Sequence, residues 1–314
     1  MGGSSAPTTS DGVLVVDKPA GMGSTDVVRV LRRVTRQRRV GHTGTLDPDA
    51  TGVLVVCLGR ATRLVRFLQE GRKTYLAQVT FGVETTTQDA SGQVVAERSA
   101  HAVTEGRLRQ ALTGFIGDIP QVPPMVSAVK VGGERLYDKA RRGEVVRREP
   151  RTVTIHDIVV ESFEAGERAH ASLLVTCSSG TYIRTLAHDL GGALGCGASL
   201  AGLRRLTNGA FTVHDAHTLA DIEGAAEHGE LRRLVLTMAE AVRGLPSVEV
   251  DAETARAVAT GRRLPATGLP GPIALVHRVG GEPTLVGIYA DDDGHARAEA
   301  VFVQPSDLQR SESR

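Results

Sequence analysis

The chain has 314 residues, a length that predicts two domains, and 41% of its residues are hydrophobic and 23% charged. These proportions exclude a fibrous repeat and a long disordered chain, and a membrane-spanning helix is excluded because the longest apolar run covers only residues 52–59. The net charge of +1 is unevenly divided: residues 1–214 carry 27 Lys and Arg against 20 Asp and Glu, whereas residues 215–314 carry 10 against 16.

The N-terminal residues predict a tail, a buried strand and a turn. Residues 1–10 lack the basic and apolar regions of a secretory signal, so we expect a short disordered tail there. Residues 12–17 are almost entirely apolar, which predicts a buried strand. The Lys-Pro-Ala-Gly sequence at 18–21 is typical of the turn that would follow it.

The next segment predicts a basic helix over about residues 26–35, which Ser24 or Thr25 can cap. Its apolar residues form one stripe for packing on the core, namely Val27, Val30, Leu31 and Val34. Six arginines follow one another without an acid between them: Arg29, Arg32, Arg33, Arg36, Arg38 and Arg39. Such a cluster is either a solvated helix face or a contact surface for a polyanion, whose neutralised phosphates release counterions.

Strand and helix patterns alternate irregularly further along the chain. The Gly-rich stretch 41–52 precedes a second buried strand over 53–58, an amphipathic segment over 61–68 and a strand over 74–81. Thr104 can cap another helix, whose apolar residues at helical spacing are Leu108, Ala111, Leu112 and Phe115. This order predicts an α+β fold with a mixed sheet rather than a doubly wound one.

The chain changes character at Gly244-Leu245-Pro246, after which short strands predominate. We expect strands over 273–279, 284–289 and 296–303, with turns at 280–281 and 291–294. The sequence therefore predicts a large domain over 11–245 and a small β module over 246–314.

The loop over 41–52 is the segment richest in reactive groups, because it holds His42, Asp47 and Asp49. The two aspartates match the first half of a calcium loop, but Leu58 stands where the twelfth position needs Glu. A zinc site would need a second His or a Cys at ligand spacing. Because nucleophile-elbow, Walker and dinucleotide motifs are also missing, the loop is best interpreted as a carrier of a reactive carboxylate.

Three cysteines, Cys57, Cys177 and Cys196, occur without a C-x-x-C pair. An odd number with this spacing indicates neither a disulfide framework nor a thiolate zinc site. We therefore expect the reducing environment of the cytoplasm.

Sequence blocks across residues 12–210 resemble one enzyme family. The loop Gly41-His-Thr-Gly-Thr-Leu-Asp47-Pro-x-Ala-Thr-Gly52 is similar to the catalytic-aspartate motif of TruB-type tRNA pseudouridine-55 synthases. Other blocks stand in the family's order, namely Val16-Asp-Lys18-Pro19-x-Gly21, Lys73-x-Tyr75, Gly82-x-x-Thr85-x-Thr87-x-Asp89, Pro123-Pro124-x-x-Ser127-Ala128-x-Lys130, Gly180-Thr181-Tyr182-Ile183-Arg184 and Leu203-Arg204-Arg205. The chain departs from the family at Gly23-Ser24-Thr25, where Thr-Ser-His is usual.

The resemblance implies a pseudouridine synthase catalytic fold, an α+β fold with a mixed, mainly antiparallel sheet flanked by helices. It also implies an isomerase that converts uridine 55 in the T-loop of tRNA to pseudouridine without a metal or cofactor. The nucleotide must leave its stack to reach an active-site pocket. The match is weak beyond about residue 245, and a PUA-like, RNA-binding character of the β module rests mainly on the way the family usually ends. The implied enzyme is a cytoplasmic protein whose partner is tRNA, and we expect a monomer.

The resemblance also implies a set of site residues. Asp47 would act as nucleophile or base, and the guanidinium of Arg184 would keep its carboxylate ionised. Tyr75 would belong to the catalytic residues together with Asp47 and Arg184, and its ring would stack on the flipped uracil. Tyr182 would lie near the reacting base, and Leu203 would read the uracil edge through its main chain. His42 would border the vacated stack, and Lys18 would contact the substrate backbone or support the loop.

Each of these residues has an ordinary structural alternative. Asp47 followed by proline is common in turns, an isolated tyrosine in an apolar strand is usually core, and Arg184 could belong to a structural ion pair. Two other functions also stay open: a related synthase that acts on another RNA, and an RNA-binding or tRNA-folding module in which catalysis is dispensable.

Overall fold

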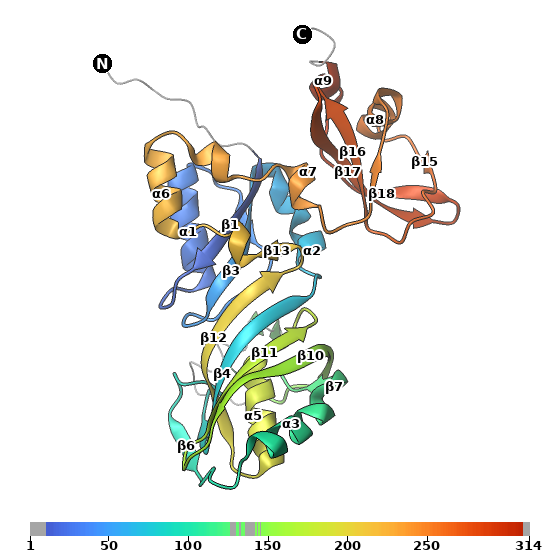
Figure 1. The fold of residues 1–314 in the computed structure, drawn as a ribbon. Coiled ribbons are helices and arrows are strands. Elements are labelled where there is room, and N and C mark those ends of the chain that lie inside the picture. Colours follow the sequence, from blue (N-terminus) through green and yellow to red (C-terminus); the bar gives the residue numbers. More distant parts are fainter. Residues whose placement is uncertain are drawn as a thin grey trace.

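A computed structural model gives the structure of the protein, and it describes residues 11–309 except 126–129, 132, 136–141, 143 and 145. One long twisted sheet runs through the upper and lower parts of the molecule, and a smaller sheet lies beside the upper part (Figure 1). The combination of a mixed sheet with flanking helices confirms the α+β prediction.

The long sheet has the strand order β1-β3-β12-β4-β11-β10-β7. Every neighbouring pair is antiparallel except β3 and β12, and the short strands β2 and β13 add to β3 and β12. Its strands are β1 (Gly12–Lys18), β2 (Val40–His42), β3 (Thr51–Leu58), β4 (Lys73–Phe81), β7 (Gly117–Gln121), β10 (Arg151–Glu164), β11 (His170–Cys177), β12 (Ala198–Asn208) and β13 (Phe211–Thr212).

Strands β1 and β3 read as continuous apolar runs because both of their faces are buried. Helices α1 (Ser24–Thr35) and α6 (Leu219–Glu227) cover one face. The other face packs on the 3₁₀ helix η1 (Gly59–Leu64) and on short helices α2 (Val65–Leu68) and α7 (Met238–Ala241). Two further 3₁₀ turns lie on either side of α6 in the chain: η3 (Val213–Asp215) precedes it, and η4 (Leu231–Leu234) connects it to α7.

Helix α1 begins earlier than predicted, and neither Ser24 nor Thr25 caps it. Gly23 is the N-cap, and its N–H donates to the Asp26 carboxylate at 3.0 Å. Ser24 is buried, and its hydroxyl bonds instead to the carbonyl of Leu46 in the loop that follows β2. The apolar stripe is also rotated from the predicted one, since Val28 is buried whereas Val30 is only half-buried.

The lower part of the molecule packs two helices against one face of the sheet. They are α3 (Glu105–Leu112), continued by the turn η2 (Thr113–Phe115), and α5 (Ile183–Leu194). Thr104 caps α3 as predicted, because its hydroxyl accepts from the N–H of Arg107 at 3.3 Å. Two small hairpins project from this part, formed by β5 (Val83–Thr85) with β6 (Val94–Glu97) and by β8 (Lys130–Val131) with β9 (Glu134–Arg135).

The smaller sheet has the order β14-β16-β17-β18-β15 and its own apolar core. Its elements are β14 (Ser247–Glu249), α8 (Ala252–Ala259), β15 (Leu264–Pro265), β16 (Ile273–Val279), β17 (Glu282–Asp292), β18 (His295–Val301) and α9 (Pro305–Gln309). The strand predicted over 273–279 is confirmed. The turn predicted over 291–294 is too long, because Asp291 and Asp292 still pair in β17.

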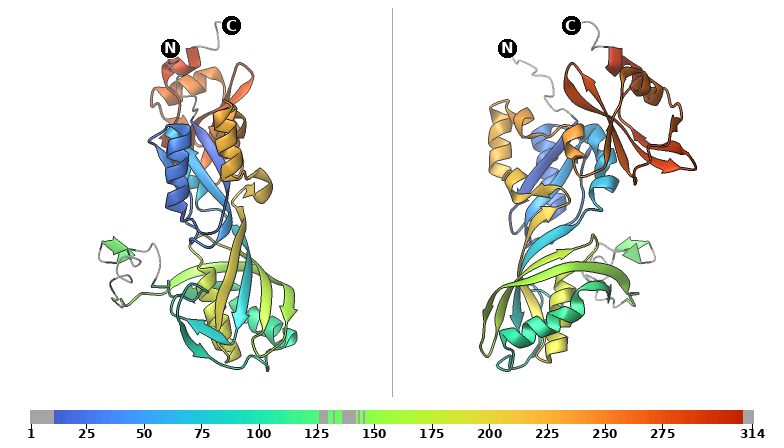
Figure 2. Two further views of the ribbon diagram at one scale, coloured as in Figure 1. Left: turned by 90° about the vertical axis from the view of Figure 1, so that its left-hand side faces the viewer. Right: turned by 45° about the vertical axis from the view of Figure 1, so that its right-hand side comes forward.

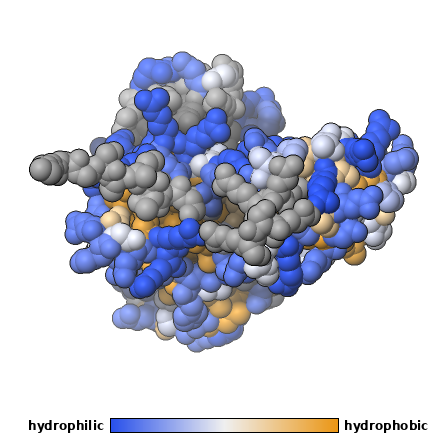
Figure 3. Space-filling view, turned by 90° about the horizontal axis from the view of Figure 1, so that it is seen from above, coloured by the Kyte–Doolittle hydropathy of each residue, from blue (hydrophilic) through white to orange (hydrophobic). Residues whose placement is uncertain are grey.

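Apolar side chains of the smaller sheet join the core beside β1 and β3, so the two sheets are in contact. Figure 2 shows the smaller sheet next to the upper part from two further directions. Seen from above, the molecule presents mainly hydrophilic residues, with hydrophobic ones in small scattered groups (Figure 3). None of the helices in the described part of the chain is long and apolar enough to cross a membrane.

Candidate active site

The loop between β2 and β3 carries Asp47, and two neighbouring elements hold it in place. The Ser24 hydroxyl, at the start of α1, donates to the carbonyl of Leu46 at 3.0 Å and accepts from its N–H at 2.8 Å. Within the loop, the N–H of Ala50 donates to the carbonyl of Asp47 at 3.1 Å. These bonds fix the main chain on both sides of the Asp47 side chain.

Lys18 lies beneath this loop and is fully buried. Its ammonium donates to the carbonyls of Pro19 at 2.8 Å, Pro48 at 2.9 Å and Met22. Burial lowers the pKa of Lys18 to about 8. These contacts tie the turn after β1 to the aspartate loop, so they favour the loop-supporting role over a direct substrate contact.

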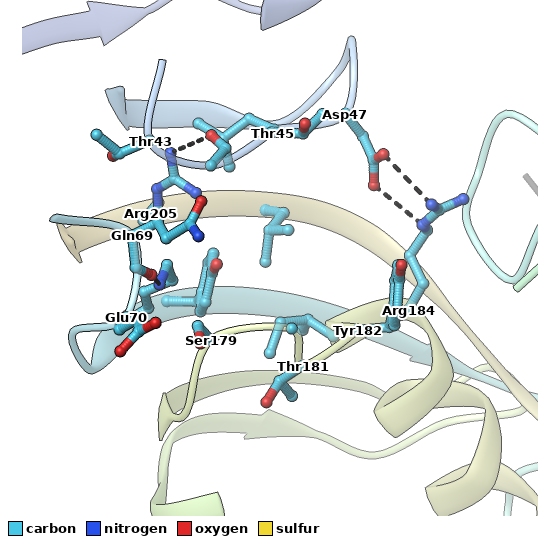
Figure 4. Close-up of a pocket in the computed structure, with 17 residues that line it drawn as sticks. Thr43, Thr45, Asp47, Gln69, Glu70, Ser179, Thr181, Tyr182, Arg184 and Arg205 are labelled. Atoms are coloured by element: carbon cyan, nitrogen blue, oxygen red, sulfur yellow. Dashed lines mark hydrogen bonds and ion pairs between the residues drawn. The ribbon is translucent and has the colours of Figure 1, made fainter. Parts of the chain in front are cut away.

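A cavity of about 440 Å³ opens below the loop (Figure 4). Three elements besides the loop contribute to its lining: strand β4 through Lys73 and Tyr75, the start of α5 through Tyr182 and Arg184, and strand β12 through Leu203 and Arg205. Residues far apart in the sequence thus meet because β4 and β12 are neighbours and α5 leads into β12.

Arg184 holds two carboxylates at one side of the cavity. Its Nε lies 3.0 Å from Oδ2 of Asp47, and its Nη2 donates to Oδ1 of the same group at 3.3 Å. Its Nη1 donates to Oδ2 of Asp89 at 3.1 Å and to the carbonyl of Thr87 at 3.3 Å. The arginine is only 4% exposed, so this network is fixed from the protein side.

Burial and the neighbouring charges act on the two carboxylates in opposite directions. Burial raises the pKa of Asp47, and the Arg184 guanidinium opposes that rise. Burial also acts on Asp89, but hydrogen bonds from Ser91 and Thr87 and the charge of Arg184 bring the pKa of Asp89 below its usual value. Asp89 is therefore the firmly ionised member, while the protonation of Asp47 depends on Arg184.

The two tyrosines are positioned by different means. Tyr75 is 7% exposed and stands on β4, directly opposite Arg205 of β12, which hydrogen-bonds to it. Tyr182 is the N-cap of α5, and the buried Gln121 side chain fixes its main chain. The Gln121 amide donates to the carbonyl of Tyr182 at 3.0 Å and accepts from its N–H at 2.8 Å.

Leu203 stands on β12 and is half-buried in the lining of the cavity. Next to it, β12 pairs with β3 at Gly52, whose φ of +96° is a conformation that favours glycine. A Cβ at Gly52 would lie 2.2 Å from the carbonyl oxygen of Arg205. Glycine at this position therefore lets the strand that bears Leu203 approach the strand that follows the aspartate loop.

His42 lies on β2, behind the loop, and does not contribute to the lining of the 440 Å³ cavity. Its Nδ1 is buried without a hydrogen-bond partner among the described residues. Burial, together with the nearby charge of Arg205, lowers the pKa of His42. The structure therefore brings Asp47, Arg184, Tyr75, Tyr182 and Leu203 together, and it places Lys18 and His42 behind them.

Sequence reasoning assigned no role to four residues of this region: Lys73, Asp89, Gln121 and Arg205. Three of them stand inside the sequence blocks that carry the family resemblance, which was the available signal. Gln121 gave no signal, because its contact with Tyr182 joins residues distant in the chain. In the block that runs from Pro123 to Lys130, residues 126–129 lie outside the described residues.

The basic cluster of α1 is partly neutralised within the chain. Arg29 pairs with Asp26 at 2.8 Å, Arg33 pairs with Glu223 at 2.8 Å, and Arg32 donates to the carbonyl of Val40 at 3.2 Å. These contacts favour a structural role for half of the cluster. Within the part of the chain that the structure describes, no group of three His, Cys, Asp or Glu side chains is arranged to hold a metal ion.

Two family models match the chain in succession. The TruB family pseudouridylate synthase N-terminal domain matches residues 32–183, and the tRNA pseudouridylate synthase B C-terminal domain matches residues 184–243. The first match includes the aspartate loop and Tyr75, and the second begins at Arg184.

Relatives with the name tRNA pseudouridine synthase B are similar over most of the chain. The protein of Symbiobacterium thermophilum is 49% identical over 82% of this chain and 84% of its own length. The protein of Arthrobacter sp. is 44% identical over 95% of this chain and 98% of its own length.

Solved structures with a similar fold include one described as a Cbf5-Nop10-Gar1 complex. It has a TM-score of 0.73 and 28% identity, and covers 95% of this chain and 86% of that chain. Another is an H/ACA RNP bound to a substrate RNA containing 2′-deoxyuridine, with a TM-score of 0.71 and 26% identity, and covers 95% of this chain and 86% of that chain.

Proposed function

The chain belongs to the TruB family of pseudouridylate synthases, and from that premise we propose that its cavity takes uridine 55 of the tRNA T-loop and isomerises it to pseudouridine. The observation that carries this proposal is the Asp47–Arg184 pair at the side of a cavity large enough for a small ligand. A uridine can enter such a cavity only after it leaves its stack.

The isomerisation breaks the C1′–N1 bond of the nucleotide and forms a C1′–C5 bond. C5 loses a proton and N1 gains one, so the reaction needs no co-reactant. Asp47 would act at the ribose, either as a nucleophile at C1′ or as a base that takes a ribose proton. Both roles require an ionised carboxylate.

Arg184 supplies that ionised state. Burial favours the protonated form of Asp47, and the Arg184 guanidinium, which contacts both carboxylate oxygens, opposes this effect. Because Asp89 occupies a further edge of the same guanidinium, Arg184 cannot rotate away without losing a second ion pair. We include Asp89 as a positioning residue for this reason.

The remaining side chains would place the base. Tyr75, buried in the lining, offers a ring for stacking, an interaction typically worth about 1–3 kcal/mol per base. Tyr182 offers a second ring at the start of α5, and the main chain at Leu203 would read the uracil edge. His42, on β2, and Lys18, which donates to the carbonyl of Pro48, would act from behind the loop.

We also propose that the protein is a monomer and that it acts on tRNA in the cytoplasm. The PUA-like module over 246–314 would make a second contact with the RNA. All three cysteines are free and buried, as a reducing compartment allows. Light scattering of the purified protein should give a mass close to the 33.2 kDa of one chain.

The test is the release of tritium from tRNA labelled at C5 of uridine. We expect Asp47→Asn to lower the rate by about four orders of magnitude or more, because it removes the reacting group. Arg184 keeps its ion pair with Asp89 in this variant, so the buried guanidinium is not left without a carboxylate and the fold should be retained. Asp49→Asn is the matched control, because it removes an exposed carboxylate from the same loop.

Release by the wild type and by Asp49→Asn, but not by Asp47→Asn, is the expected result. Tight tRNA binding without release by the wild type would instead assign the protein to RNA binding or to another RNA substrate. Equal release by Asp47→Asn and the wild type would remove Asp47 from the chemistry.

A further inference from the structure

Two buried cations, Lys73 and Arg205, lie in the lining of the cavity away from the Asp47–Arg184 pair. Lys73 is 5% exposed and Arg205 is 1% exposed. The Lys73 ammonium donates to the carbonyls of Gln69 at 2.7 Å and Gly71 at 3.0 Å. Arg205 donates to the carbonyls of Val53 at 2.7 Å and Gly44 at 3.2 Å.

No carboxylate balances either charge among the residues that the structure describes. All the bonds that Lys73 and Arg205 make there go to main-chain carbonyls or to Tyr75. Glu70 also lines the cavity, but it is exposed and forms no ion pair with them. Two cations taken out of water without a counter-charge are costly, so the cavity is preorganised to receive negative charge.

These cations lie beside the ring on which the base would stack. Lys73 and Tyr75 are two residues apart on β4 and therefore share one face of the sheet. Arg205 stands opposite Tyr75 on β12. In Figure 4, Arg205 and the Asp47–Arg184 pair occupy opposite sides of the cavity. A base whose ribose faces Asp47 would extend across Tyr75 toward the two cations.

The proposed reaction develops negative charge on that base. When the C1′–N1 bond breaks, its electron pair leaves with the uracil, whichever role Asp47 plays at the ribose. The detached ring is then an anion, with its charge spread over N1, O2 and O4. The ring stays an anion until its electron pair forms the C5–C1′ bond, and a proton then moves from C5 to N1 without a change in net charge.

We propose that Lys73 and Arg205 form an electrostatic site for the detached uracil anion, in which they face its exocyclic oxygens and keep the ring in the cavity while it turns. This inference rests on the proposed function and adds two residues to its chemistry. Fixed charges aimed at developing charge in a water-poor site are among the largest contributions to catalysis. Lys73 acts through its ammonium, whereas Arg205 also supports Gly44 and Tyr75.

Lys73 is the better residue to test, because Arg205 has structural bonds on three elements. We expect Lys73→Gln to lower the single-turnover rate by about 10²-fold and to leave the Kd for tRNA nearly unchanged. Lys73→Arg keeps the charge and should recover much of the loss. Arg72→Gln is the matched control, because it removes the charge of the neighbouring exposed residue.

A substrate with a better leaving group separates this role from a structural one. Fluorine at C5 withdraws electrons and stabilises the detached ring, so RNA with 5-fluorouridine at the target position needs less help from the cations. The defect of Lys73→Gln should therefore shrink from about 10²-fold with uridine to about tenfold or less with 5-fluorouridine. The rate of 5-fluorouridine consumption is measured by nuclease digestion and mass spectrometry.

Equal defects on both substrates would overturn the inference and make Lys73 a structural residue. Weaker tRNA binding with normal chemistry at saturation would also overturn it, because the cations would then hold a phosphate. If wild type converts neither substrate, the proposed function itself fails, and this result is distinct from a wild type that converts both while the variant defects are equal.

Discussion

Arginine occurs in two settings in this molecule. At the cavity, Arg184 and Arg205 are almost completely buried and bond to groups on several elements. At the contact between the two sheets, Arg60, Arg63 and Arg66 extend from η1 and α2 to the last strand of the smaller sheet and beyond, and they remain exposed. The side chain is the same, but its surroundings differ.

This difference predicts where the removal of a single charge has large consequences. A buried ion pair that loses one partner leaves the other charge uncompensated in a poorly solvated site. An exposed pair loses little, because water and salt screen the charge that remains. We therefore expect substitutions at the cavity to change the chemistry and substitutions at the junction to change little.

Among substitutions of the arginines, the largest effect should come from Arg184→Met. We expect a loss of about 10²- to 10³-fold in rate at neutral pH, since Asp47 loses the charge that opposes its burial. Without Arg184 the pKa of Asp47 rises further, so the fall of activity toward acid pH should begin at a higher pH than in the wild type. Single-turnover rates across the acidic and neutral range measure this shift.

Arg168→Met provides the comparison for that experiment, because Arg168 is exposed and pairs with Glu97 at 2.6 Å. Arg168→Met should change neither the rate at neutral pH nor the pH at which activity falls on the acid side. An acid limb that stays in place in Arg184→Met would show that Asp47 does not depend on Arg184.

A smaller effect is expected from alkaline pH. Burial lowers the pKa of Lys73 to about 8, helped by the charge of Arg205, whereas burial raises the pKa of Cys177 to about 11 and also raises that of Tyr75. Lys73 thus loses its proton before these two neighbours. If its ammonium takes part, the rate should fall about tenfold per unit of pH above pH 8.

Lys73→Arg sharpens this test, because a guanidinium does not titrate in the same range. The variant should keep its rate at alkaline pH where the wild type loses activity. The same decline in both proteins would assign the alkaline limb to another group.

The smallest effect should come from the junction. Arg63 donates to the carbonyl of Val301 at 2.6 Å and lies over the ring of Phe302 at 5.2 Å. Because it is exposed, we expect Arg63→Ala to lower the free energy of unfolding by about 1 kcal/mol or less and to leave the rate constant unchanged. Thermal melting measures the first quantity and tritium release the second; a large loss of activity would contradict the comparison.

The sequence identified the parts of the fold in which a local pattern agrees with burial. Strands β1 and β3 follow apolar runs, and Thr104 caps α3 as its position predicts. The patterns left β12 unassigned. Its buried Arg205 and half-buried Arg204 hide the alternation that a strand with one apolar face would show.

The site was predictable where the family resemblance assigns a residue its role. Asp47 and Arg184 were predicted to pair, and they lie together although 137 positions separate them. The paths by which Gln121 fixes Tyr182 and Arg205 supports Gly44 could not be predicted, because each joins a side chain to a distant main-chain group. The roles of the site residues stay predictions until the variants are measured.

The parallel pairing of β3 with β12 has a consequence for how the protein is made. Thr51 and Gly52 meet Arg204 and Arg205 only after about two thirds of the chain has been synthesised. Contacts of such large sequence separation form late and slowly in folding. During translation, the strand that follows the aspartate loop therefore lacks its partner β12. The cavity can be completed, and enzymatic competence can begin, only when β12 has emerged from the ribosome.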